Sequence, residues 1–218
     1  GNSSNGVLLY LSASGTLRAY GPSVSGTVTT TVVVGQWYHI ALTRSGNTWT
    51  LWKDGVSQGT FTDSGSFNPG STRPFSIGGN SFVSSNSYLS SFRIVKGTAV
   101  YTTTFTPPTA PLTAITNTSL LLNFTNAGII DNAEMNDLET VGNAQISTAQ
   151  SKFGGGSMAF DGTGDFLYGA PSESYQLGTG DFTIEFWLRG TQADNTAGTI
   201  TCGANNNWIN GNIVVDRD

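Results

Sequence analysis

The chain has 218 residues, enough for one large β domain or two small ones. Hydrophobic residues make up 37% and aromatic residues 11%, which can supply a packed core. Charged residues make up only 11%, well below the roughly 25% of an average globular protein. A net charge of −5 without any Lys/Arg cluster argues against nucleic acid or anionic lipid as partners. The single cysteine, Cys202, excludes an intrachain disulfide framework, and no apolar run approaches the ~20 residues of a membrane span.

Strand signals run through the whole chain. They are short, rich in Val, Ile, Thr and aromatic residues, and separated by clusters of Gly, Asn, Ser and Pro. This spacing predicts an all-β sandwich with at most one helical turn, at Ser172 to Gln176. In chain order the predicted strands are 7–11, 16–20, 27–34, 37–42, 49–52, 75–78, 88–95, 119–124, 144–148, 157–160, 166–169, 182–188, 199–202 and 212–215.

The stretch from Gly35 to Phe61 predicts a three-stranded meander. It holds three of the five tryptophans and the only histidine, His39. Its second turn, Asp54-Gly55, fits a two-residue hairpin because glycine adopts a positive φ at little cost. We expect His39 to pack within a strand, and we expect the strand tryptophans to lie in the core, namely Trp37, Trp49, Trp52 and Trp187.

The proline-rich segment 103–112 divides the chain. Its three prolines between Thr103 and Pro111 remove backbone donors and favour extended geometry. We therefore predict two units, residues 1–112, which end in this linker, and residues 113–218. The two halves share no motif and are not repeats of one another.

The meander and the segments after it resemble the C-terminal half of a laminin G-like, concanavalin A-type jelly roll. The second half of the chain resembles the N-terminal half of the same fold. The segment that joins the two halves, from Phe92 to Leu121, is similar to virion structural proteins of tailed phages of marine bacteria. The residues that carry the resemblance are Gly35-Gln36-Trp37, Leu51 to Gly55, Phe75 to Gly79 and Leu89 to Arg93 in the first half, and Gly154-Gly155, Ser157 to Gly162, Asp165 to Leu167 and Gly180 to Trp187 in the second.

The halves therefore stand in inverted order relative to the family. Joining the ends, residues 213–218 followed by 1–11 give strand, turn and strand, as in an uninterrupted β-hairpin. Two arrangements follow for this jelly roll of two antiparallel sheets. In the first, the chain belongs to a tandem array and each half completes a sandwich with a neighbouring copy. In the second, one chain closes on itself in permuted order, with its termini adjacent. We favour the array, because such repeats occur in series and Gly1 is not a natural start.

A glycoside hydrolase needs two carboxyl groups at a short, defined distance from each other. Asp181 and Glu185 share a strand face but are four residues apart, roughly 13 Å, which exceeds the ~5–9.5 Å that hydrolases use. The Glu-x-Asp-x-x-Glu pattern of laminarinase-like relatives is absent. We therefore predict that the protein is not an enzyme, and that Glu185 is an ordinary strand residue.

The resemblance implies that no cofactor is required, with Ca²⁺ as an optional ion at the rim of the sandwich. Calcium prefers hard oxygen ligands, which two loops concentrate. The alternative for each loop is a solvated acidic turn. The candidate metal ligands are Asp131, Asn132, Glu134 and Asp137 in the first loop, and Asp161 and Asp165 in the second.

A glycan site would need an exposed aromatic ring beside amide or carboxylate side chains. Trp208 lies among loop-forming residues with Asn207 and Asn210, and Tyr20 and Arg18 are expected to join it across the hairpin. The alternative is that Trp208 caps the core.

These features predict a non-enzymatic structural and adhesive repeat of an extracellular or virion fibre, displaying a jelly-roll surface for host or glycan contact. The alternative is a dedicated carbohydrate-binding lectin module, assisted by calcium. The expected partners are neighbouring copies of the chain and a cell-surface glycan, with neither nucleic acid nor membrane.

Overall fold

The computed structural model describes residues 8–11, 15–23, 26–67, 75–79, 85–124, 129, 131, 133, 138–170, 172–190 and 198–202. These residues form fifteen β-strands and one 3-10 turn. The elements are β1 (Leu8–Leu11), β2 (Thr16–Tyr20), β3 (Thr27–Thr31), β4 (Tyr38–Ser45), β5 (Thr48–Lys53), β6 (Val56–Thr62), β7 (Phe75–Ile77), β8 (Asn86–Lys96), β9 (Thr118–Leu122), β10 (Leu138–Val141), β11 (Gln145–Ser147), β12 (Ser157–Asp161), β13 (Phe166–Gly169), η1 (Glu173–Tyr175), β14 (Phe182–Gly190) and β15 (Gly198–Cys202).

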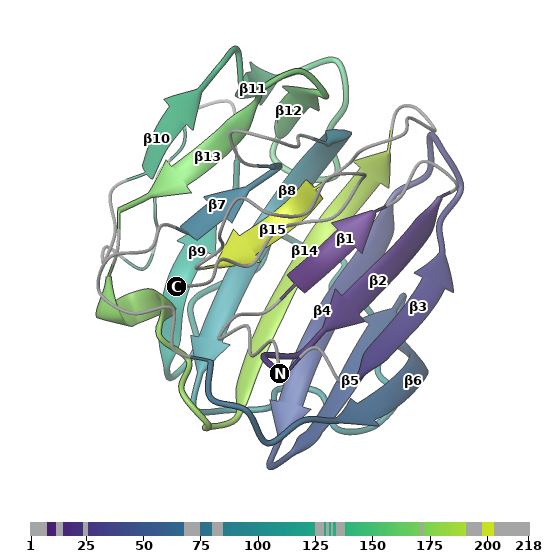
Figure 1. The fold of residues 1–218 in the computed structure, drawn as a ribbon. Helices are drawn as coiled ribbons and strands as arrows, with labels where there is room; N and C mark the ends of the chain where they lie inside the picture. The colour runs from purple at the N-terminus through teal and green to yellow at the C-terminus, as the bar shows by residue number, and fades with distance from the viewer. Residues whose placement is uncertain are drawn as a thin grey trace.

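The strands form two antiparallel sheets that stack face to face (Figure 1). The first sheet has the order β10-β13-β7-β15-β1-β2-β3, and we call it sheet A. The second has the order β11-β12-β8-β14-β4-β5-β6, with β9 pairing β8 beside β12, and we call it sheet B. The structure therefore confirms the predicted all-β sandwich, in which the single helical turn lies at η1.

The two halves of the chain interleave in both sheets. In sheet B, β14 from the second half lies between β8 and β4 from the first. In sheet A, β7 from the first half lies between β13 and β15 from the second. The chain thus closes on itself as one sandwich, and the tandem array loses its main support. The assignment of the halves to the two ends of the family's fold stays a prediction.

The hairpin expected across the joined ends does not form on β1. Both edges of β1 are occupied, by β15 on one side and β2 on the other. Residues 212–215, the other strand of that hairpin, lie outside the described residues. The second half of the chain therefore reaches β1 through β15.

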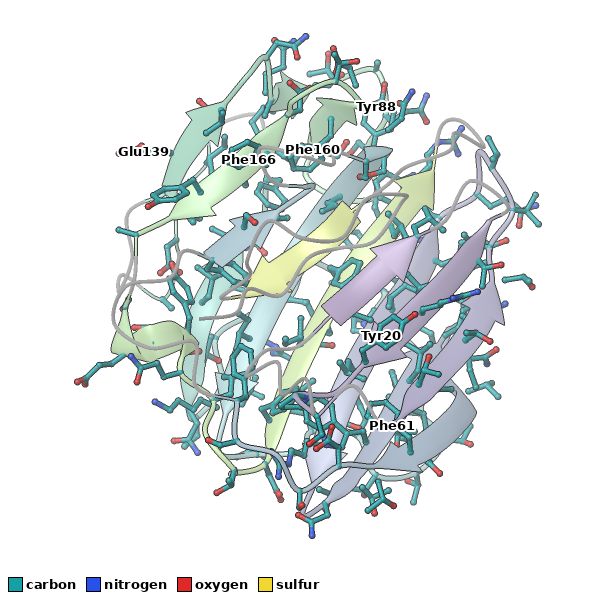
Figure 2. The ribbon with its side chains drawn as sticks, viewed as in Figure 1. Tyr20, Phe61, Tyr88, Glu139, Phe160 and Phe166 are labelled. Atoms are coloured by element: carbon teal, nitrogen blue, oxygen red, sulfur yellow. The ribbon has the colours of Figure 1, made fainter. Side chains whose placement is uncertain are left out.

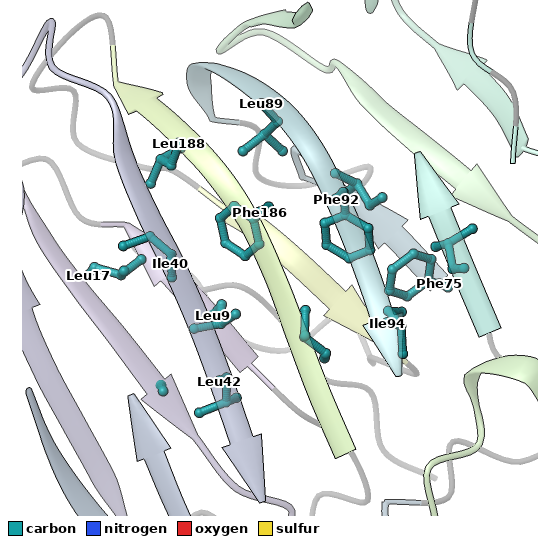
Figure 3. Packing of buried hydrophobic residues seen from close by; sticks show 14 of the residues in the cluster. Leu9, Leu17, Ile40, Leu42, Phe75, Leu89, Phe92, Ile94, Phe186 and Leu188 are labelled. Atoms are coloured by element: carbon teal, nitrogen blue, oxygen red, sulfur yellow. The ribbon is translucent and has the colours of Figure 1, made fainter. Parts of the chain in front are cut away.

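One hydrophobic core fills the space between the sheets. Along β14, Phe182, Ile184, Phe186 and Leu188 all face this core and are fully buried, as the alternation of that strand predicts. Figure 3 shows two of them, Phe186 and Leu188, among core residues from β1, β2, β4, β7 and β8. Its labelled residues are Leu9, Leu17, Ile40, Leu42, Phe75, Leu89, Phe92, Ile94, Phe186 and Leu188.

The proline-rich segment is a surface crossover, so its assignment as a linker between two units is wrong. We call residues 98–113 the strap. The strap lies on the outer face of sheet B, where the Phe105 N–H donates to the Gly55 carbonyl at 3.0 Å. At its ends, the Thr183 hydroxyl donates to the Thr98 carbonyl at 3.1 Å, and Arg93 Nη1 donates to the Thr113 carbonyl at 2.7 Å. The strap therefore excludes solvent from the middle of the outer face of sheet B.

The strap also changes which tryptophans belong to the core. Of the four tryptophans that the structure describes, Trp49 alone lies in the core cluster. Trp52 and Trp187 are buried on the outer face of sheet B instead, and Trp37 is only half-buried. The alternation of apolar residues could not show this, because it assigns residues to a face without showing what covers that face.

Among the differences from the sequence prediction, two concern strands of sheet A. The strand predicted at 27–34 ends at Thr31, and Val33 and Val34 are exposed. The short strand β10 was not predicted, since only Leu138 and Val141 are apolar in it and it lies on the edge of sheet A. Edge strands bury less and therefore carry a weaker pattern.

The Asp54-Gly55 turn has φ values of +50° and +80°, which confirms the predicted hairpin. A methyl group at Gly55 would collide with the Phe105 carbonyl of the strap, whereas one at Gly46 (φ +59°) would meet nothing within 4 Å.

We expect Gly46→Ala to cost about 1–2 kcal/mol from its backbone conformation alone. Gly55→Ala should cost a further ~1–3 kcal/mol from overpacking. Urea unfolding of both variants measures the difference, and equal losses would contradict the close contact between turn and strap.

Candidate functional site

The outer face of sheet B is covered over most of its described width. The strap covers its centre, and the loop before β12 covers the next row, where the Phe153 ring meets Trp187 edge-on at 5.8 Å. The Lys152 ammonium lies 3.9 Å from the centre of the Trp187 ring. Beyond this loop, the same face carries a hollow of about 230 Å³ at the corner formed by β8, β11 and β12.

Register explains why polar side chains line this hollow. Gln145 pairs with Ala159, which pairs with Tyr88, so the three form one row across the outer face. Asp161 pairs with Asn86 in the next row. Tyr88 is half-buried and Gln145 is exposed, and Figure 2 shows Tyr88 and Phe160 at this end of the molecule. The described residues of the lining are Asn86, Tyr88, Asn143, Gln145, Ala159, Phe160, Asp161 and Asp165.

Two carboxylates hold the wall of the hollow in place. Asp165 is 1% exposed, and its oxygens accept from the backbone N–H groups of Asn143 and Asp161, each at 2.9 Å. Asp161 is exposed and accepts from Asn143 Nδ2 at 3.0 Å and from the Thr163 N–H at 2.7 Å. The Asn143 amide, followed by the Thr163 N–H, lowers the pKa of Asp161, so this carboxylate stays ionised at neutral pH.

These contacts fit calcium poorly. Every oxygen of Asp161 and Asp165 already faces an N–H donor, and calcium needs six to eight oxygen ligands. Among the described residues, no three His, Cys, Asp or Glu side chains gather as a metal-binding group. A calcium ion at this corner stays a prediction.

The other predicted metal loop lies elsewhere in the fold. Asp131 is 8% exposed, and its Oδ1 accepts from the N–H groups of Leu121 and Ala133 at 2.9 Å. Asp131 forms an isolated β-bridge with Leu122, which pairs with Phe92 on β8. Phe92 is six residues, or roughly 20 Å, from Asn86, which lines the hollow. The two predicted metal loops therefore lie apart. The remaining candidates of this loop, Asn132, Glu134 and Asp137, lie outside the described residues.

The predicted glycan residues are described only in part. Arg18 and Tyr20 lie together on β2, with Arg18 Nη1 3.4 Å from the Tyr20 hydroxyl. They belong to sheet A, so the hollow and this pair lie on different sheets (Figure 2). The predicted centre of that site, Trp208 with Asn207 and Asn210, lies outside the described residues.

A buried ion cluster lies beneath the strap, and sequence reasoning missed it. Glu185 Oε1 accepts from Arg93 Nε at 2.8 Å and also pairs with Arg93 Nη2. Glu185 Oε2 lies 3.2 Å from His39 Nε2 and accepts from the Tyr101 hydroxyl at 2.7 Å. Side chains from β4, β8 and the strap thus meet at this one carboxylate on β14.

Aromatic rings seal the cluster from water. The Phe105 ring stacks on Tyr101 with centres 3.6 Å apart, and it meets the edges of His39 and Trp52 at 5.6 and 5.7 Å. Glu185 and His39 are both 0% exposed. Because substrate has no path to this carboxylate and all its oxygens are partnered, the cluster fits a structural role rather than catalysis.

The cluster perturbs the proton affinity of its members. Burial by itself raises the pKa of Glu185, but the hydrogen bond from His39, the charge of Arg93 and the Tyr101 hydroxyl hold that pKa below its ordinary value. Burial, followed by the charge of Glu185, raises the pKa of Tyr101 far above its ordinary value. Glu185 is therefore ionised and Tyr101 neutral at physiological pH.

Within the described ranges, the structure contains no helix with the length and apolarity that a membrane span needs. No curated protein and no solved structure gives a match to the chain. The family model Laminin_G_3, described as the concanavalin A-like lectin/glucanases superfamily, matches residues 1–111. Laminin G-like modules of this kind are generally non-enzymatic and typically extracellular. With half of its length matched and a sandwich of two antiparallel sheets, the chain belongs to the concanavalin A-like lectin/glucanases superfamily as a laminin G-like module.

Proposed function

We propose that the chain is a non-enzymatic adhesive module of an extracellular or virion fibre, and that it contacts glycan through the hollow at β8, β11 and β12. The observation that carries this proposal is the lining of the hollow. One half-buried aromatic ring, Tyr88, lies beside the amides of Asn86, Asn143 and Gln145 and the carboxylate of Asp161. Sugars are bound by this combination, in which a ring packs on C–H groups while amides and carboxylates pair with hydroxyls.

The surroundings of the hollow support binding without catalysis. The wall is preorganised, because Asp165 fixes the Asn143 backbone and Asp161 fixes the Asn143 side chain. The second carboxylate of the lining, Asp165, is 1% exposed and both its oxygens accept from backbone N–H groups. Glu185, on the outer face of β14, is sealed beneath the strap. A preorganised site loses less entropy when a ligand binds, whereas acid–base chemistry would need a reachable pair of carboxyl groups.

Neighbouring copies of the chain are the proposed partners within the fibre. A closed sandwich with its own core needs no strand from a neighbour, so copies would be joined in series as separate modules. In such a series each hollow is presented many times, and weak contacts add up through effective concentration. The role of the fold is then to hold the hollow on a rigid support.

A glycan array probed with the multivalently displayed protein tests the proposal. We expect binding, and we expect Tyr88→Ala to weaken it by about tenfold, because an aromatic contact contributes roughly 1 kcal/mol or more. Tyr20→Ala is the matched control on sheet A and should leave binding unchanged. Loss of binding with Tyr20→Ala but not with Tyr88→Ala would place the site on the other sheet and contradict the proposal.

Repeating the glycan array with a chelator tests the second candidate function, a lectin module that depends on calcium. One observation favours it, namely that Asp161 and Asp165 line the same hollow. Because their oxygens already accept N–H donors, we expect binding to survive the chelator. Binding that disappears with the chelator supports the calcium-assisted lectin, and no binding in either condition contradicts glycan contact altogether.

A further inference from the structure

The charge around the hollow has a single sign. Its lining includes the carboxylates of Asp161 and Asp165, and none of the described lining residues is Lys, Arg or His. The Asp161 carboxylate is exposed, and the lowered pKa described above keeps it ionised. A ligand in the hollow therefore meets a fixed negative charge at its wall.

Two cations described on the same face, Arg189 and Lys152, are engaged elsewhere. Arg189 is the partner of Tyr88 on β14, but its guanidinium donates to the Gly35 carbonyl on the side away from the hollow. Lys152 rests on the ring of Trp187. Neither side chain lines the hollow, so neither offsets the charge of Asp161 there.

The uncharged polar side chains of the lining are suited to hydroxyls. Asn86, Asn143 and Gln145 each carry an amide, which both donates and accepts, and Tyr88 carries a hydroxyl that does the same. A sugar hydroxyl also donates and accepts, and Asp161 can accept from it. A carboxylate or sulfate can only accept, so it would find the carboxylate of Asp161 repulsive.

The volume limits what the hollow can hold. At about 230 Å³ it is smaller than the ~300–1,000 Å³ of sites that enclose a drug-sized ligand. It has room for about one sugar unit, and a contact of that size corresponds to a dissociation constant on the order of millimolar.

From this lining we infer that the hollow selects uncharged saccharides and discriminates against anionic ones, holding one sugar unit by Tyr88 and the three amides while Asp161 repels acidic sugars. This inference rests on the proposed glycan contact and adds the class of glycan to it. A like charge about 4 Å from Asp161 costs on the order of fivefold in affinity even in full solvent, and more where solvent is partly excluded.

The test compares glycans that share one core. The multivalently displayed protein is exposed to lactose, sialyllactose and sulfolactose, together with the corresponding set built on N-acetyllactosamine. We expect the neutral member of a bound set to be preferred by fivefold or more. Raising the salt concentration should reduce this preference, because screening weakens an exposed charge pair.

Two variants decide whether Asp161 is the cause. Asp161→Asn should lower the ratio of neutral to anionic binding by about fivefold. Glu139→Gln is the matched control, since it removes one exposed charge on β10 of sheet A and should leave the ratio unchanged. Figure 2 shows Glu139 at the left edge of the molecule, apart from Tyr88 near the top.

The outcomes separate the two proposals. Anionic members that bind as well as, or better than, their neutral parents overturn the inference while the glycan contact stands. An equal fall of the ratio in Asp161→Asn and Glu139→Gln also overturns it, because the preference would then come from net charge. If no glycan binds at all, the proposed function fails and the inference fails with it.

Discussion

Replacing Glu185 by alanine is expected to lower the free energy of unfolding by about 3–5 kcal/mol, because it leaves the charge of Arg93 buried without its partner. The Glu185 side chain is 0% exposed and Arg93 only 6% exposed, so water cannot replace the lost carboxylate. His39 and Tyr101 lose their partner as well. Urea denaturation monitored by tryptophan fluorescence measures the loss.

A matched control and a double variant sharpen this experiment. Glu139→Ala removes an exposed carboxylate from β10 and should leave the unfolding midpoint unchanged. The pair Arg93→Met with Glu185→Leu should regain part of the stability, since apolar residues of similar size often replace a buried ion pair without loss. A cost below about 1 kcal/mol for Glu185→Ala would show that the cluster does not hold the strap.

The same cluster gives the stability a defined dependence on pH. The pKa of Glu185 is lowered in the folded state, so its contribution is present above the unfolded value of about 4.3. That contribution is lost as the pH falls through the folded pKa. The difference in stability between the wild type and Glu185→Gln should therefore shrink below about pH 4.3.

Local chemistry made the strands and turns of this fold predictable. Asp54-Gly55 specifies a hairpin through its φ values, and the alternation from Phe182 to Leu188 specifies which face meets the core. Neither signal depends on distant parts of the chain. The pairing of strands does depend on them, and this is why sequence alone left the array and the closed sandwich open.

The ion cluster shows where such reasoning ends. His39 and Glu185 are 146 residues apart, and each was expected to be an ordinary strand residue. Their meeting depends on the register that pairs Glu185 with Ala41 and with Arg93, and on the strap that brings Tyr101 over them. The one available signal was a charged residue within an apolar strand, which is rarely buried without a partner.

The hollow was predictable only in part. Asp161 and Asp165 stood out as acidic residues in a glycine-rich turn, and the structure does place them together. Tyr88 and Gln145 carried no signal, because they reach the same corner only through their pairing with Ala159. Binding residues that come from three neighbouring strands become visible only when the register is known.

The family match and the strand order lead to different expectations for the first half of the chain. The match ends at residue 111, so residues 1–111 could pass for a complete domain. The sheets indicate otherwise, since β14 separates β8 from β4, and β13 and β15 flank β7. A fragment that ends in the strap would leave these long strand edges unpaired, and unpaired edges expose both backbone groups and core side chains.

We therefore expect the fragments 1–112 and 113–218 each to be unfolded alone, and to fold when mixed in equal amounts. The full chain should be a monomer with one cooperative transition whose midpoint does not depend on concentration. Circular dichroism, NMR dispersion and light scattering measure these properties. Folding of 1–112 by itself would contradict the interleaved sheets. Open-ended assembly of the full chain would instead restore the tandem array, because halves that pair between copies form the same strand contacts in an unclosed series.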